Sequence, residues 1–156
     1  MIDKLMSGRV YFLIRCALAF VFLYAGAAKL LDAHGFARVI GGYGVLPDQL
    51  NLVAAYLLPV SEIIIAAGLI WDVRGALSAY SLLLLVFMGV LVRGISMGLD
   101  VDCGCFAPGD PEGEAYHSLR EALVRDAFLL CGCGYLFLLR RTRGFRSRPL
   151  LSFVGR

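Results

Sequence analysis

The sequence predicts an all-α fold: a polytopic membrane protein built as a bundle of four transmembrane helices. Of its 156 residues, 60% are hydrophobic and only 17% are charged, and the mean hydropathy is +0.78. A soluble domain averages about 45–50% apolar and about 25% charged residues, and a chain this short has too little interior to bury the excess. These values exclude a free soluble domain, a disordered chain and a large multidomain enzyme.

Four apolar segments are each long enough to cross a hydrocarbon core of ~30 Å as a helix that rises ~1.5 Å per residue. None of them alternates polar and apolar residues, which argues against strands. We therefore expect a single membrane domain, 1–156, with spans at about residues 10–31, 50–71, 76–93 and 119–140.

Turn and capping residues support these boundaries. Asp72 and Gly75 mark a short turn between the second and third spans. Ser118 begins a Ser-x-x-Glu capping box, so the fourth helix should begin near Leu119. The segment 32–49 ends in several glycines and a proline, and we expect a short helix followed by a loop there.

Basic residues predict the orientation. The tail 141–156 is rich in arginine and has no acid, so the positive-inside rule places it in the cytoplasm. Four spans then place the N-terminus there as well, and the loops 32–49 and 94–118 outside. The expected location is the bacterial inner (plasma) membrane. The basic tail is interpreted as a topology signal that contacts anionic lipid, and no nucleic acid is expected as a partner.

Two of the five cysteines lie in the acidic outer loop as Cys103-Gly104-Cys105. The outside of a bacterial inner membrane is oxidising. A bridge between thiols separated by one glycine is strained and easily reduced, so the pair is expected to cycle between dithiol and disulfide. We predict Cys103 and Cys105 as the catalytic pair.

Three cations are expected at the same level as this pair: Lys29, Arg93 and Arg125. Positive charge beside a thiol lowers the pKa of the thiol and raises the thiolate fraction. The first interpretation is therefore that these residues stabilise a reactive thiolate. The alternative is that their long side chains extend to the lipid headgroups, as they do in many spans.

The remaining cysteines are Cys16, Cys131 and Cys133, all inside spans. Residues two apart on a regular helix point about 200° apart, so Cys131 and Cys133 cannot bridge without local unwinding. Cys16 enters from the opposite membrane face to a similar depth. The three are either a second redox set that relays electrons or small core residues, and we favour the core interpretation.

A metal site is not expected. Cys103 and Cys105 with His117 and Asp102 would supply four ligands, as a closed zinc site requires. No second pair of cysteines or histidines is nearby in the sequence, however.

Glu62 lies ~18 Å into the second span, close to the bilayer centre. A carboxylate at that depth is expected to be protonated, paired or both. The functional interpretation is that Glu62 bonds a quinone or carries a proton. The structural interpretation is an interhelical hydrogen bond, for which Asp126 beside Arg125 is a candidate partner.

Motifs in both halves of the chain resemble the MauE family of methylamine-utilisation membrane proteins, which are related to DoxX. In the second half, residues 102–106 resemble its Asp-Cys-Gly-Cys-Phe-Gly signature, with Ala107 in place of the last glycine, and Arg125-Asp126 fits its fourth span. The first half resembles the family at Ala28-Lys29-Leu30-Leu31-Asp32, Phe36, Ile40, Tyr43, Leu46-Pro47, Leu58-Pro59, Glu62 and Gly68.

The resemblance implies a four-helix membrane protein associated with disulfide formation. In the methylamine system the family is linked to the maturation of a disulfide-rich dehydrogenase subunit. The four-span layout is also similar in outline to the DsbB and vitamin K epoxide reductase proteins, which pass electrons from thiols to quinone. That second likeness is one of architecture.

The functional hypothesis is a membrane thiol–disulfide redox protein. If it is an enzyme, the expected activity is that of a quinone-linked thiol:disulfide oxidoreductase. Its expected partner is an extracytoplasmic thiol protein, either thioredoxin-like or a disulfide-rich client, and its expected cofactor is quinone. An oxidising protein that drains to quinone and a reducing one fed from the cytoplasm would use the same residues. Two alternatives stay open: a membrane carrier of soft metal ions with cysteine ligands, and a non-catalytic membrane subunit of a redox or sulfur-metabolising complex.

Overall fold

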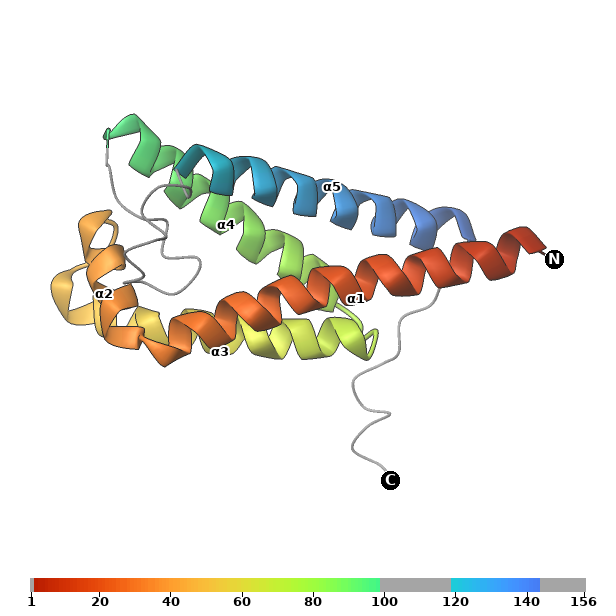
Figure 1. Cartoon of the computed structure of the whole chain (residues 1–156), viewed down its shortest axis with the longest axis horizontal. Helices are drawn as coiled ribbons and strands as arrows, with labels where there is room; N and C mark the ends of the chain where they lie inside the picture. Colours follow the sequence, from red (N-terminus) through yellow and green to blue (C-terminus); the bar gives the residue numbers. More distant parts are fainter. Residues whose placement is uncertain (1, 99–118, 144–156) are drawn as a thin grey trace, which may run out of the picture.

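The computed structural model describes residues 2–98 and 119–143. These ranges contain no strand, and four of their five helices are long and apolar enough to cross a membrane, which confirms the predicted fold class. The helices are α1 (Ile2–Leu31), α2 (Ala33–Gly42), α3 (Asp48–Ile70), α4 (Ala76–Ser96) and α5 (Leu119–Arg143) (Figure 1).

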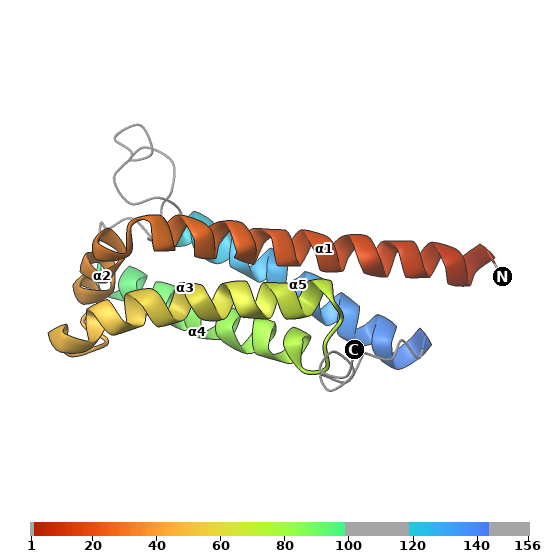
Figure 2. The ribbon, with the colours of Figure 1, turned by 90° about the horizontal axis from the view of Figure 1, so that it is seen from below.

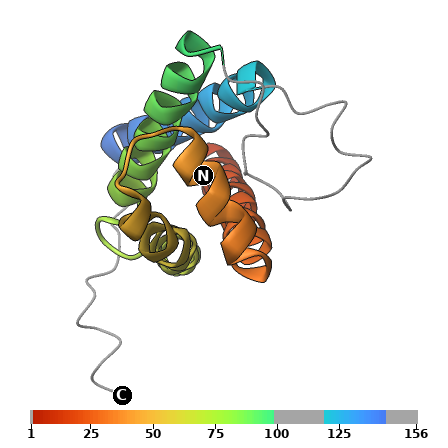
Figure 3. The ribbon, with the colours of Figure 1, turned by 90° about the vertical axis from the view of Figure 1, so that its left-hand side faces the viewer.

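The four long helices form two pairs. α1 packs mainly along α3, and α4 packs along α5 (Figures 1 and 2). The short α2 lies across one end of the bundle, where it contacts α3, as the end-on view of Figure 3 shows. α3 extends past the end of α1 at this end, and α2 occupies the space beyond α1 (Figures 1 and 2).

Local sequence explains the breaks between helices. The Oδ1 atom of Asp32 accepts a hydrogen bond of 2.8 Å from the backbone N–H of Gly35, which caps α2 and starts it immediately after α1. The α3–α4 turn places Asp72 at φ 57° and Gly75 at φ 92°, both in the left-handed region that glycine and aspartate tolerate best. α5 is helical from Leu119, the first residue described after the gap, and Ser118 of the predicted capping box lies outside the described residues.

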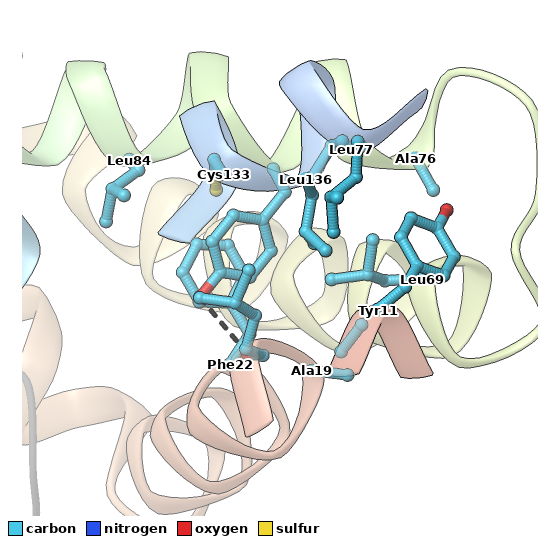
Figure 4. Packing of buried hydrophobic residues seen from close by; sticks show 13 residues of the cluster. Tyr11, Ala19, Phe22, Leu69, Ala76, Leu77, Leu84, Cys133 and Leu136 are labelled. Carbon is cyan, nitrogen blue, oxygen red and sulfur yellow. Dashed lines mark hydrogen bonds between the residues drawn. The ribbon is translucent and has the colours of Figure 1, made fainter. Parts of the chain in front are cut away.

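The core of the bundle is built around stacked aromatic rings. The rings of Phe22 and Tyr80 lie 3.7 Å apart, and the Tyr80 hydroxyl donates a hydrogen bond of 3.1 Å to the carbonyl of Leu18. Cys133 and Leu136 enter this cluster from α5 (Figure 4). Large apolar side chains such as Phe20 and Phe128 are about 70% exposed on the outside, as expected where lipid replaces water.

A polar network closes the end of the bundle opposite α2. Asp72 accepts from Arg15 Nη1 at 2.7 Å, from Arg140 Nη2 at 2.6 Å and from the Tyr11 hydroxyl at 2.9 Å. Arg140 Nε also donates to the Tyr11 hydroxyl at 2.9 Å. A single carboxylate therefore ties α1, the α3–α4 turn and α5 together.

Candidate functional site

An ion pair lies buried between α1 and α3. Lys29 Nζ is 2.5 Å from Glu62 Oε1, and the two side chains are 5% and 1% exposed. The second carboxylate oxygen, Oε2, is also buried and has no hydrogen-bond partner among the described residues. Sequence reasoning singled out both residues but named Asp126, beside Arg125, as the candidate partner of Glu62, which is instead Lys29.

The pair forms because α1 and α3 approach closely at Gly26. A methyl group at this position would lie 2.9 Å from the Pro59 carbonyl oxygen and 3.3 Å from Glu62 Cβ. Only glycine leaves room for this approach without a shift of the neighbouring atoms. One turn further along α1, Lys29 therefore meets Glu62 in the middle of α3, since α3 continues well beyond the end of α1.

A second ion pair lies on α5 next to the first. Arg125 binds Asp126 through Nη2 at 2.9 Å and through Nε at 3.0 Å. Adjacent residues of a helix point in different directions, but the long arginine side chain folds back to its neighbour. Lys29, Glu62, Arg125 and Asp126 together line a small cavity of about 20 Å³. Among the described residues, two positive and two negative side chains thus meet at this cavity, three of them buried and Arg125 half-buried.

A larger apolar cavity of about 380 Å³ adjoins Lys29, between α2, α3 and α4. Lys29 Nζ lies 4.7 Å from the centre of the Phe87 ring and 5.5 Å from that of Phe36, and both residues line the cavity. Tyr43 also lines it and packs on α4 at Gly94, where an added methyl group would lie 2.5 Å from the Tyr43 ring. Lys29 thus reaches both the charged group and the apolar cavity.

The other predicted site residues are placed separately. Cys103 and Cys105 lie outside the described residues, as do His117 and Asp102, so their roles stay predictions. Arg93 is exposed in the last turn of α4 and does not line either cavity that contains Lys29. The structure therefore brings Lys29 and Arg125 together and leaves Arg93 apart from them.

The three cysteines of the spans are free thiols. α5 stays helical through Cys131 and Cys133, and the two differ in burial: Cys131 is exposed and Cys133 is 1% exposed in the core. Cys16 is partly exposed on α1. The position of Cys133 among core side chains (Figure 4) favours the packing interpretation for this residue. The predicted second redox set stays a prediction.

Sequence reasoning missed the walls of the apolar cavity. Phe36, Tyr43 and Phe87 come from three separate segments, and nothing in their spacing indicates that they meet. In 2–98 and 119–143, no three His, Cys, Asp or Glu side chains are grouped so that they could hold a metal ion.

A family model described as methylamine utilisation protein MauE matches residues 7–139. The chain belongs to the MauE family. The MauE proteins of Paracoccus denitrificans and Paracoccus versutus, both named methylamine utilization protein MauE, are 37% and 32% identical to it. The alignments cover 83% and 78% of this chain, and 72% and 67% of the relatives. No solved structure matches the chain.

Proposed function

We propose that this MauE-family membrane protein is a thiol–disulfide redox protein that oxidises the cysteines of an exported client and passes the electrons to membrane quinone. Cys103 and Cys105 are the exchanging pair. The client is a thiol protein outside the membrane, and the name of the relatives suggests methylamine utilisation as the setting. The bundle lies in the bacterial inner membrane with both termini in the cytoplasm.

The observation that carries the proposal is the grouping of chemical features at one end of the bundle. The segment with Cys103 and Cys105 joins Gly98 to Leu119, and Leu119 packs near α4: a methyl group on Gly94 would lie 3.3 Å from Leu119 Cδ1. The group of Lys29, Glu62, Asp126 and the half-buried Arg125 lies towards this end with the apolar cavity, on the side of α2. The arginine-rich segment follows the opposite end of α5, which supports the orientation.

The proposed exchange proceeds through a mixed disulfide. A client thiolate attacks the Cys103–Cys105 disulfide, and one sulfur of the pair leaves as a thiolate. The second client thiolate then attacks the mixed disulfide, which leaves the client oxidised and the pair reduced. To reset the pair, two electrons and two protons must leave its two thiols.

A bound quinone would supply the two-electron acceptor that this reset needs. The residues present suit such a group: the cavity beside Lys29 is apolar and flanked by aromatic rings, and the ammonium of Lys29 can donate to a carbonyl oxygen. The Glu62 carboxylate neutralises this ammonium, and its free Oε2 can accept a proton. Arg125 is held by Asp126 at the other wall of the charged cavity.

The test is thiol trapping in intact cells, with an acid quench followed by an impermeant maleimide. Wild type, Cys103→Ser and Cys105→Ser are compared, with and without quinone synthesis. The proposal predicts a pair that is oxidised at rest and accumulates reduced without quinone. It also predicts that neither single variant oxidises the client, because one remaining cysteine cannot form the disulfide that the client thiolate attacks.

Cys131→Ser serves as the control, because its thiol is exposed towards lipid on α5. If Cys103 and Cys105 are accessible to the maleimide yet stay reduced both with and without quinone synthesis, the proposed oxidase function is wrong. A client that matures normally in both serine variants would instead favour a non-catalytic membrane subunit.

A further inference from the structure

We propose that the cavity between α2, α3 and α4 binds the ring of a membrane quinone, with Lys29 Nζ donating a hydrogen bond to a ring carbonyl. This inference rests on the proposed function for the choice of quinone. It deepens that function because it places the ring on the Phe36–Phe87 side of Lys29, away from Glu62, which sequence reasoning suggested as the quinone site.

The size and walls of the cavity suit an aromatic ring. Its volume of about 380 Å³ falls within the range of about 300–1,000 Å³ typical of small-ligand sites. Phe36 and Phe87 flank Lys29, and the rest of the described wall consists of Tyr43 and aliphatic side chains such as Leu58 and Leu91. A planar apolar ring can pack between such side chains, whereas a strongly hydrated ligand would lose its water without replacement.

Among the residues that the structure describes, Lys29 is the one charged group in this wall. Its ammonium has three N–H donors, and its one hydrogen bond among the described residues goes to Glu62. The residue is 4% exposed, so water does not readily accept from the other donors. A carbonyl oxygen in the cavity would accept one of them.

The charge balance selects a neutral acceptor over an anion. Glu62 already neutralises Lys29, so the carboxylate of a fatty acid would bring an uncompensated buried charge. A quinone carbonyl accepts the same hydrogen bond without that charge. The cavity should therefore bind a quinone in preference to a fatty acid, although both ligands are soluble in lipid.

The lining residues also indicate the route of entry. Leu57, Val86 and Val45 line the cavity and are 64%, 50% and 48% exposed. These apolar side chains lie on α3, on α4 and in the α2–α3 connection, on surfaces that face lipid in a spanning bundle. A ligand therefore reaches the cavity from within the bilayer, as a quinone with a hydrocarbon tail would.

The test measures binding directly, so that it does not depend on thiol chemistry. The full chain, with Cys103→Ser and Cys105→Ser, is purified in lipid nanodiscs and titrated with a decyl-tailed benzoquinone by equilibrium dialysis. Decanoic acid and decane, which carry a similar tail without the ring, are the comparison ligands. We expect saturable binding of the quinone only.

Two variants locate the site. Ala54→Phe fills the cavity from α3, and we expect it to abolish saturable binding, whereas Ala17→Phe on the exposed face of α1 should leave binding unchanged. The double variant Lys29→Met with Glu62→Met removes both charges together and should weaken binding about tenfold or more, since a hydrogen bond to a charged donor is lost. Thermal unfolding confirms that each variant is folded.

Saturable binding that survives Ala54→Phe would overturn the cavity assignment while leaving the proposed function intact. Equal binding of decane or decanoic acid would show a lipid groove without ring recognition and would also overturn it. Quinone binding at this cavity in a protein whose Cys103–Cys105 pair does not respond to quinone in cells would support the site and contradict the proposed function.

Discussion

The pair of Lys29 and Glu62 is held where neither charge reaches water. Removing both charges of a buried pair is often tolerated, whereas removing one partner leaves the other charge buried and uncompensated. The two residues are 4% and 0% exposed, so this asymmetry should be strong here. Their pairing therefore gives the bundle a specific α1–α3 register in addition to any role beside the cavity.

We expect Lys29→Met alone to lower the free energy of unfolding by about 3–5 kcal/mol. The double variant Lys29→Met with Glu62→Met should recover most of this loss, because no buried charge is left alone. Thermal and denaturant unfolding of the purified proteins in detergent measure the loss in the single variant and its recovery in the double variant. A double variant no more stable than the single variant would contradict the account of the pair.

Asp72 is the second residue on which several elements depend. It accepts from Arg15, Arg140 and Tyr11 at once, and it adopts φ 57°. Asparagine tolerates this backbone conformation nearly as well as aspartate, so Asp72→Asn removes the charge with little backbone effect.

Asp72→Asn should lower the free energy of unfolding by about 1–3 kcal/mol, since two guanidinium groups lose their carboxylate. Arg74→Gln in the same turn is exposed and should have little effect. Thermal and denaturant unfolding of the two variants measure this difference. Equal effects of the two changes would show that the Asp72 network does not contribute to the free energy of unfolding.

At the level of the helices, α1 and α3 are held together by close approach as well as by charge. Gly26 faces the Pro59 carbonyl, so a larger side chain there pushes the two helices apart. A methyl group added to Gly89 on α4 would meet no neighbouring helix within 4 Å among the described residues. The two glycines share a helical backbone but differ in their neighbours, which makes them a matched pair.

The two positions should respond to alanine with opposite sign. Gly89→Ala should raise the free energy of unfolding by up to about 1 kcal/mol, because alanine favours helix over glycine. Gly26→Ala should lower it despite the same gain, since its methyl group meets a backbone oxygen. Unfolding midpoints under identical conditions report both, and a stabilising Gly26→Ala would mean that the helices are not in close contact there.

The elements also show how far the sequence predicts this molecule. Four apolar helices and the turn at Asp72–Gly75 follow from local patterns, and the structure has both features. The partner of Glu62 did not follow, because depth was counted along each span alone. α3 extends past α1, so Lys29 near the end of one helix meets Glu62 in the middle of another.

For the molecule as a whole, the proposed orientation rests on the arginines around the end of α5. If both termini are cytoplasmic, green fluorescent protein fused after Arg156 should fluoresce, and alkaline phosphatase fused at the same place should be inactive. An active phosphatase fusion would reverse the orientation and place Cys103 and Cys105 in the cytoplasm, where disulfides are rarely stable.

The central claim concerns electron flow from the cysteine pair to quinone, and reconstitution tests it most directly. The protein is reduced, freed of reductant in proteoliposomes and given a decyl-tailed benzoquinone, while thiols and quinol are counted. The account predicts quinol formed mole for mole with disulfide, no such reaction in Cys103→Ser or Cys105→Ser, and an unchanged reaction in Cys131→Ser. Thiols that remain reduced in excess quinone would contradict it.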